Sequence, residues 1–270
     1  MVTTRDDLSI LLSGPPPQPD WLIPGLIPKA SMIALCGLAG VGKSVFGYTL
    51  AVAMAAGLPF LGRQTTPART LYMDEENGRR ERRAYIYRAW VGLGRPSVPA
   101  IVDNMIVHGF ALSTSQFPWD AQLRILTQEA KPDLIVIDTA TPACHIQDEN
   151  SNSEASMAAQ KLRGVMNLAG PDCSMIVMKH LRVDHKTGHV DVRGAKFWKG
   201  TVDAILYHRK PVGRPRKDGY HRSYIRPEKV RAFGLRTEII IDARQIEDGN
   251  GCVLEGKDQE IEEAKPGQGE

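Results

Sequence analysis

The chain has 270 residues, 42% of them apolar, and a formal net charge of +3. This length and composition allow one large hydrophobic core, so we expect a single catalytic domain. No apolar run approaches the ~20 residues needed to cross a bilayer, and no signal-peptide pattern follows Met1. The four cysteines are scattered without a C-x-x-C pair, which argues against a zinc site and a disulfide framework. We therefore expect a cytoplasmic protein without a membrane partner.

Charge is distributed unevenly along the chain. Residues 179–236 contain 16 Lys and Arg but only 5 Asp and Glu, whereas residues 237–270 contain 3 and 10. A basic block of this size predicts a polyanionic partner such as a nucleic acid, because neutralised phosphates release their counterions. The alternative is a charged face that only contacts solvent.

The first 30 residues are predicted to form an arm or linker, because Pro15–Pro17 remove backbone donors and favour an extended chain. Strand-like and helix-like segments alternate from residue 31 onward, which is typical of a parallel sheet flanked by helices. The predicted strands cover residues 31–36, 70–73, 105–109, 134–137 and 175–179, and the predicted helices cover 45–56, 79–93, a segment after Pro118, and 153–168.

The pattern changes after residue 200. Residues 204–208, 220–226 and 237–242 are strand-like and separated by turn residues, which predicts an antiparallel extension of the sheet. We therefore predict an α/β fold with one catalytic domain over residues 31–245. Residues 246–270 are predicted to form an acidic, disordered tail.

The first predicted strand leads into a complete G-x-x-x-x-G-K-S phosphate loop, followed by an Ala-rich helix. Backbone amides of such a loop bind phosphate, its lysine contacts the β and γ phosphates, and its serine binds Mg²⁺. The sequence therefore predicts ATP and Mg²⁺ as ligands. The predicted nucleotide-binding residues are Gly37, Leu38, Ala39, Gly40, Val41, Gly42, Lys43, Ser44 and Val45.

Carboxylates also follow two other predicted apolar strands, at 70–73 and 134–137. Asp138 follows Leu134–Ile137 and is predicted to bind Mg²⁺ together with Ser44, the alternative being a helix cap. Hydrolysis also needs a carboxylate that orients the attacking water. We expect Glu76, after the strand at 70–73, to be this residue, with Glu75 as second choice because alternation directs only one of them toward the nucleotide. The alternative is a solvated acidic loop.

The strand at 175–179 is followed by His180, a polar side chain that can sense the γ phosphate. The next segment, 181–200, is basic and rich in glycine, a composition suited to contact with a single-stranded nucleic-acid backbone. Phe197 and Trp198 are either stacking residues or core residues. The predicted DNA-binding residues are Arg182, Lys186, Arg193, Lys196 and Lys199.

Together these motifs resemble the RecA-like hexameric replicative helicases, and most closely the RepA family of plasmid replication helicases. The resemblance spans roughly residues 15 to 240. It is carried by Pro15–Pro17, Gly37–Ser44, Leu71–Met73 with Glu76, Leu134–Thr139, His145–Asn150, His180, Arg193–Gly194 and Asp203. It implies a RecA-like core, a hexameric ring, Mg-ATP hydrolysis at subunit interfaces and movement along single-stranded DNA in a plasmid or phage replication system.

Ring ATPases of this type use a cation from the neighbouring subunit to stabilise charge on the γ phosphate. By similarity, Arg231 would be this cation and Lys229 its companion, with Arg209 as a second candidate. Two alternative functions remain at this stage. One is a RecA-like regulatory or recombination ATPase that binds DNA without unwinding it, and the other is a P-loop kinase acting on a small molecule.

Overall fold

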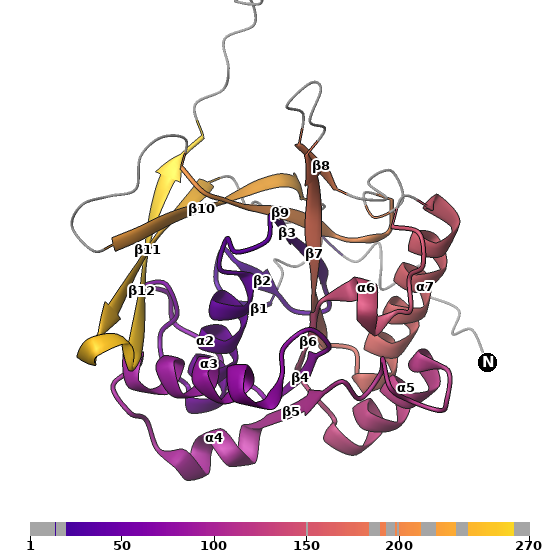
Figure 1. Cartoon of the computed structure of the whole chain (residues 1–270), viewed down its shortest axis with the longest axis horizontal. Helices are drawn as coiled ribbons and strands as arrows, with labels where there is room; N and C mark the ends of the chain where they lie inside the picture. Colours follow the sequence, from indigo (N-terminus) through magenta and orange to yellow (C-terminus); the bar gives the residue numbers. More distant parts are fainter. Residues whose placement is uncertain are drawn as a thin grey trace, which may run out of the picture.

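The structure of the protein is a computed structural model that describes residues 14, 20–149, 151–183, 190–192, 198, 200–211, 220–230 and 237–261. Its centre is a ten-stranded sheet with the order β12-β11-β10-β9-β3-β7-β6-β4-β5, and β8 pairs with β7 outside this path (Figure 1). The strands of this sheet are β3 (Met32–Gly37), β4 (Thr70–Asp74), β5 (Met105–Gly109), β6 (Leu134–Asp138), β7 (Ser174–Val183), β8 (Val190–Val192), β9 (Ala204–Arg209), β10 (Tyr220–Val230), β11 (Thr237–Ile246) and β12 (Gly251–Glu260).

The six strands β9, β3, β7, β6, β4 and β5 are parallel to one another, and β10, β11 and β12 continue the sheet in antiparallel pairs. Every residue of β3, β4 and β6 is buried, as expected for strands covered by helices on both faces. The fold is therefore α/β with an antiparallel extension, as the sequence predicted.

Helices cover both faces of the parallel strands. Side chains of α2 (Lys43–Ala56) and α3 (Arg79–Gly92) pack on one face, and Ile101 of α4 (Val98–Asn104) contacts the same cluster. The opposite face is covered by α5 (Trp119–Ala130), α6 (Ala140–Ala143) and α7 (Asn152–Ala169). Alternate strand residues enter the two clusters, which makes a three-layer core. Among the described residues, no helix combines the length and apolar character needed to span a membrane.

The predicted arm is partly folded. Trp21–Ile23 (β1) and Ile27–Pro28 (β2) form a small antiparallel sheet whose apolar side chains join the core on the α2 side. The prediction of a linker over residues 1–30 is thus wrong for 20–30, where Pro and Gly obscured the short apolar runs. Pro15–Pro17 lie outside the described residues.

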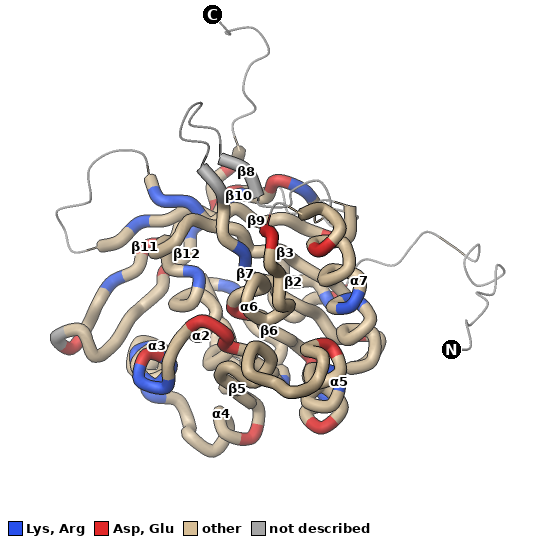
Figure 2. The backbone as a smooth tube through the Cα atoms, turned by 45° about the vertical axis from the view of Figure 1, so that its right-hand side comes forward, with Lys and Arg blue, Asp and Glu red and all other residues tan. Residues whose placement is uncertain are grey.

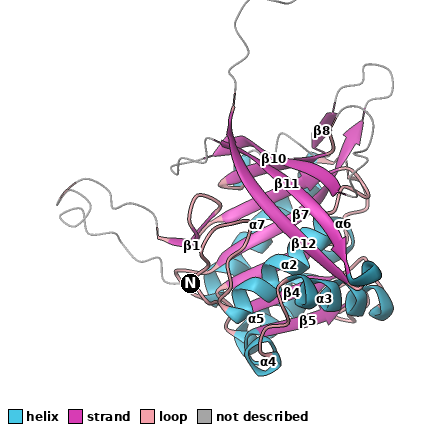
Figure 3. Ribbon diagram, turned by 90° about the vertical axis from the view of Figure 1, so that its left-hand side faces the viewer, coloured by secondary structure: helices cyan, strands magenta, loops and turns pink. Residues whose placement is uncertain are grey.

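The prediction of a tail over residues 246–270 is also corrected, because β12 pairs with β11 over ten residues. Figure 3 shows the β11–β12 hairpin reaching down to α3. An edge strand that is half exposed tolerates charged side chains, and most of the exposed residues of β12 are acidic. These charges hid the strand-like alternation in the sequence. The short 3-10 turn Glu247–Gly249 joins the two strands. Residues 262–270 lie outside the described residues.

We expect Gly256→Val to lower the melting temperature on the order of 5 °C, since overpacking costs about 1–3 kcal/mol. A Cβ at Gly256 would lie 2.5 Å from Leu61 Cβ and 2.8 Å from its carbonyl oxygen, so β12 packs directly on this loop. Thermal unfolding monitored by circular dichroism measures the effect. Lys257→Val, at the next and exposed position, is the matched control and should be nearly neutral. Equal melting temperatures for both variants would contradict the packing of β12.

Candidate active site

Four parallel strands end side by side at one edge of the sheet, where α/β folds place their ligands. β3 leads into the phosphate loop, and its neighbour β7 presents His180. Beyond β7, the last residues of β6 and β4 are Asp138 and Asp74, which are partners in the strand register. These positions have the same alternation as the strand residues that pack on α2. The predicted catalytic motifs therefore meet on the α2 side of the sheet.

The phosphate loop has the backbone that its sequence predicts. Gly42 precedes α2 with φ 106°, a left-handed conformation that favours glycine. A Cβ at Gly37 would lie 2.8 Å from the carbonyl oxygen of His208, so β9 leaves no room for a side chain there. The start of the loop thus packs closely against β9, and the loop leads directly into the N-terminal end of α2, where anions are stabilised.

Lys43 is the central cation of the site. Its Nζ donates to the carbonyl oxygens of Gly37 at 2.9 Å and Leu38 at 3.1 Å. It also lies 3.4 Å from Nδ1 of His180. Burial lowers the pKa of the Lys43 ammonium, while the carboxylates of Asp138 and Glu76 oppose this shift. The ammonium is therefore held by weak, exchangeable contacts that a phosphate can replace.

His180 connects this lysine to Glu76. Since an ammonium can only donate, Lys43 can form a hydrogen bond to Nδ1 of His180 when that nitrogen carries no hydrogen, and the ring hydrogen is then on Nε2. Nε2 is 3.5 Å from a carboxylate oxygen of Glu76. The contact with His180 is the main reason why the pKa of Glu76 is lowered, and Lys43 and Thr139 add to it. Glu76 is thus an ionised, partly exposed carboxylate beside the phosphate-binding lysine.

Glu75 has a different environment. It is 2% exposed, and its two carboxylate oxygens accept from the backbone amides of Leu112 at 3.1 Å and Ser113 at 2.9 Å. Glu75 therefore fastens the segment after β5 to the end of β4. Of the two glutamates that the sequence offered as the water-orienting residue, Glu76 is the one whose side chain contacts His180, the neighbour of Lys43.

Asp138 is fully buried, and its Oδ2 accepts from the hydroxyl of Tyr72 at 2.8 Å. Its Oδ1 is buried without a hydrogen-bond partner among the described residues. Burial raises the pKa of Asp138 to about 6, while Ser44 and Tyr72 lower it and Asp74 and Glu76 raise it further. A buried carboxylate oxygen without a partner, beside the Ser44 hydroxyl, is the oxygen donor set that Mg²⁺ prefers. The residues present thus fit the predicted metal ion.

A family model described as an AAA domain matches residues 3–186, which is more than half of the chain. The chain belongs to this AAA domain family. A solved structure with a similar fold is that of a KaiC-like protein, PH0186, from the hyperthermophilic archaeon Pyrococcus horikoshii OT3, with a TM-score of 0.55 and 14% identity over 86% of this chain and 93% of that chain. No curated protein matches the sequence. The fold of this AAA-domain protein is RecA-like, as predicted. Its family and its phosphate loop together support a P-loop ATPase.

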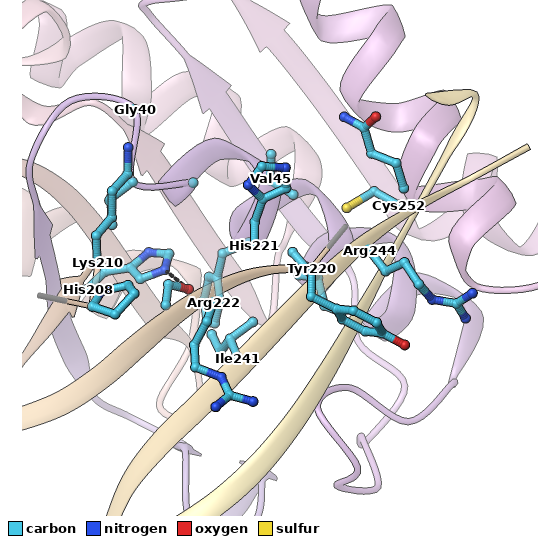
Figure 4. Close-up of a pocket in the computed structure, with 18 residues that line it drawn as sticks. Gly40, Val45, His208, Lys210, Tyr220, His221, Arg222, Ile241, Arg244 and Cys252 are labelled. Carbon is cyan, nitrogen blue, oxygen red and sulfur yellow. Dashed lines mark hydrogen bonds between the residues drawn. The ribbon is translucent and has the colours of Figure 1, made fainter. Parts of the chain in front are cut away.

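A cavity of about 390 Å³ opens on the other side of β3, between the phosphate loop and the antiparallel strands (Figure 4). Gly40, Val45 and Phe46 line it on one side, and residues of β9 to β12 line it on the other. His208 is 2% exposed in its wall. Nε2 of His208 lies 2.9 Å from the Ser223 hydroxyl oxygen, and Nδ1 has no partner among the described residues. Burial lowers the pKa of His208 to about 3, so the ring is neutral.

The remaining predicted cations are only partly within the described residues. Arg209 is exposed at the end of β9, with its guanidinium 4.7 Å from the centre of the Tyr207 ring. Lys229 donates to the carbonyl oxygen of Val202 at 3.0 Å within its own chain. Arg182 is in β7, but its side chain is outside the description. Arg231 lies outside the described residues. The same is true of four predicted DNA-binding residues, Lys186, Arg193, Lys196 and Lys199.

Several residues of the site were not predicted from the sequence. Tyr48 and Tyr72 contact the buried carboxylates, and His208 and Lys210 line the cavity. Tyr72 was visible as a polar hydroxyl inside an apolar strand two residues before Asp74, a signal that could have indicated a carboxylate partner. For His208 and Lys210 the sequence held no such signal, because their position depends on the pairing of β9 with β3.

Lys179 and Trp198 form a contact on the opposite face of the sheet. Trp198 is fully buried, so it is a core residue rather than a base-stacking one. The ammonium of Lys179 lies 4.2 Å from the centre of its ring. Burial lowers the pKa of Lys179 to about 8. β7 thus carries a destabilised cation, Lys179, on the face of the sheet opposite to His180.

For Lys179→Met we expect a free energy of unfolding above that of wild type at pH 7, with a difference that shrinks toward pH 10. The folded pKa of Lys179 is below the unfolded value of about 10.4, so its protonation opposes folding and wild-type stability rises with pH in this range. The lowered pKa of Lys179 corresponds to a cost of about 3 kcal/mol in the free energy of folding with the charged lysine. This cost exceeds the gain from a cation–π contact, which is about 1–2 kcal/mol. Urea denaturation at pH 7 and pH 10 measures both values. A difference that does not change with pH would contradict this account.

Proposed function

We propose that this AAA-domain protein hydrolyses Mg-ATP at the edge of β3, β4, β6 and β7, and that hydrolysis drives movement along single-stranded DNA, as in ring helicases. The observation that supports this proposal best is the series of contacts from Lys43 through His180 to Glu76. These contacts bring Glu76, His180 and Lys43 into one small region, which supports a water-orienting role for Glu76 beside the lysine of the phosphate loop.

Each residue has a distinct task in the proposed reaction. Lys43 releases the carbonyls of Gly37 and Leu38 and binds the phosphates, so its charge stabilises the transferring phosphoryl group. Glu76 accepts a hydrogen bond from the attacking water and orients it toward the γ phosphate. Ser44 and Asp138 would hold Mg²⁺, which would supply positive charge to neutralise the phosphates. Glu75 keeps the strand end rigid, because its carboxylate binds two backbone amides.

The nucleoside part of ATP is proposed to enter the cavity beside the phosphate loop. Glu76 and Asp138, which are proposed to act at the γ phosphate, lie on the β7 side of β3. The rest of the nucleotide would therefore extend toward β9 and β10. The cavity there has an apolar wall with Phe46 and Ile241, and His208, Lys210 and Arg222 add polar side chains to its lining. This combination of apolar surface and a few polar groups is typical of small-molecule sites.

The DNA part of the proposal rests on the basic block and on the family resemblance. β7 continues from His180 into Leu181–Val183, which begins the predicted DNA-binding segment. Figure 2 shows further Lys and Arg positions in α3 and along the antiparallel strands. Loss of the γ phosphate would change the partners of His180, and β7 would transmit this change to the basic segment. We propose a hexameric ring in which Arg231, Lys229 or Arg209 reaches the nucleotide of the neighbouring subunit.

Glu76→Gln should lower the ATP turnover number by about 100-fold or more and leave ATP affinity within a few-fold of wild type, because a carboxamide cannot polarise the water. Steady-state hydrolysis and equilibrium binding of a fluorescent ATP analogue measure the two quantities. Glu81→Gln, an exposed acid in the first turn of α3, is the matched control and should hydrolyse ATP like wild type. A wild-type turnover number for the Glu76 variant would exclude it as the water-orienting residue.

Single-stranded DNA should stimulate ATP hydrolysis by the full chain, and light scattering with Mg-ATP should give a mass near six subunits. In the double variant Lys196→Ala, Lys199→Ala we expect stimulation to fall relative to basal hydrolysis, and the salt dependence of DNA binding to become weaker. Hydrolysis without DNA stimulation by a monomer would favour a small-molecule kinase. Stimulation without strand displacement would favour a regulatory or recombination ATPase.

A further inference from the structure

Two buried tyrosines lie directly behind the carboxylates of the site. Tyr72 is in β4 and Tyr48 is in α2, and both are fully buried. Their rings stack with centroids 4.2 Å apart and an interplanar angle of 13°. Tyr85 of α3 stacks on the outer face of Tyr48 with a centroid distance of 5.6 Å. The three rings form a column that joins β4, α2 and α3.

The hydroxyl of Tyr72 is committed to one oxygen of Asp138. It donates to Oδ2 at 2.8 Å across the adjacent strands β4 and β6, while Oδ1 has no partner within the described part of the chain. A Cβ at Gly47 would lie 2.4 Å from Cε of Met178 and 2.7 Å from this hydroxyl oxygen, so the glycine in α2 leaves space for both side chains. The hydrogen bond thus fixes the carboxylate and leaves the other oxygen available to a cation.

Tyr48 has the same relation to the second carboxylate. Its hydroxyl donates to Oδ2 of Asp74 at 2.6 Å. Oδ1 of Asp74 accepts from the backbone amides of Glu76 at 3.1 Å and Asn77 at 2.8 Å. Asp74 therefore holds the turn that presents Glu76, and Tyr48 holds Asp74.

We propose that the two stacked tyrosines are separate positioning residues for the two halves of the reaction. Tyr72 orients Asp138 for Mg²⁺, and Tyr48, through Asp74, orients the turn that carries Glu76. This inference rests on the proposed function, because it assigns Asp138 to the metal and Glu76 to the water. It adds that the Tyr72 hydroxyl affects Mg²⁺ binding and the Tyr48 hydroxyl affects the rate of hydrolysis, although the two rings are in contact.

The experiment measures two quantities in the full-length protein. The first is the Mg²⁺ concentration that gives half-maximal binding of a fluorescent ATP analogue, and the second is the turnover number at saturating Mg²⁺. We expect Tyr72→Phe to raise the Mg²⁺ midpoint about 10-fold, the lower range for residues that orient metal ligands. Tyr48→Phe should leave the midpoint within about 2-fold of wild type and lower the turnover number about 10-fold.

Tyr85→Phe is the matched control, since its ring belongs to the column and no hydrogen bond of its hydroxyl occurs within the described residues. It should change neither quantity. Gly47→Ala is a second test, because it displaces the Tyr72 hydroxyl without removing it, and it should also raise the Mg²⁺ midpoint. Thermal melting of each variant establishes that it is folded at the assay temperature.

The outcomes separate this inference from the proposed function. Wild-type protein that binds the analogue without any Mg²⁺ dependence would overturn the metal site itself and the inference with it. A Mg²⁺-dependent wild type with an unchanged midpoint in both Tyr72→Phe and Gly47→Ala would overturn the inference alone. The same would follow if Tyr48→Phe and Tyr72→Phe changed one and the same quantity.

Discussion

The site depends on the burial of the central strands on both faces. Strands β3, β4 and β6 have no exposed side chain, so their interior positions are apolar and polar groups gather at their ends. Parallel pairing then brings these ends to one edge, where the phosphate loop, two aspartates and His180 become neighbours. The chemistry of the protein is thus concentrated by the same packing that stabilises the fold.

Four carboxylates at this edge create an electrostatic problem that the structure solves with individual partners. Asp74 binds the hydroxyl of Tyr48 and the amides of the following turn, and Glu75 binds two amides after β5. Glu76 is ionised next to His180 and Lys43, whereas burial raises the pKa of Asp138. Neutral donors therefore bind Asp74, Glu75 and one oxygen of Asp138, while Glu76 lies next to Lys43 and the second oxygen of Asp138 is left for a cation.

Much of the fold and part of the site could be predicted from the sequence, because both depend on local patterns. Apolar runs that end in a glycine loop or a polar residue marked β3, β4, β6 and β7, and the phosphate loop located the nucleotide. The sequence favoured Glu76 over Glu75 only by the alternation of the strand, since the environment of Glu75 depends on where the segment after β5 supplies free amides. β12 was missed because a half-exposed edge strand carries as many charges as a tail.

The β11–β12 hairpin, which the sequence concealed, has a mechanical consequence. Arg95 binds Glu247 in the turn of the hairpin, and Arg88 donates to the carbonyl of Gly249, so the hairpin is clamped to α3 (Figure 3). The hairpin forms one wall of the cavity beside the phosphate loop, and α3 begins directly after the turn with Glu76. The two ends of the site are therefore linked around the outside of α2. A ligand in the cavity that displaced the β11–β12 hairpin would therefore also shift α3, the helix after the turn with Glu76. Binding in the cavity would then change the position of this turn without any movement of the central sheet.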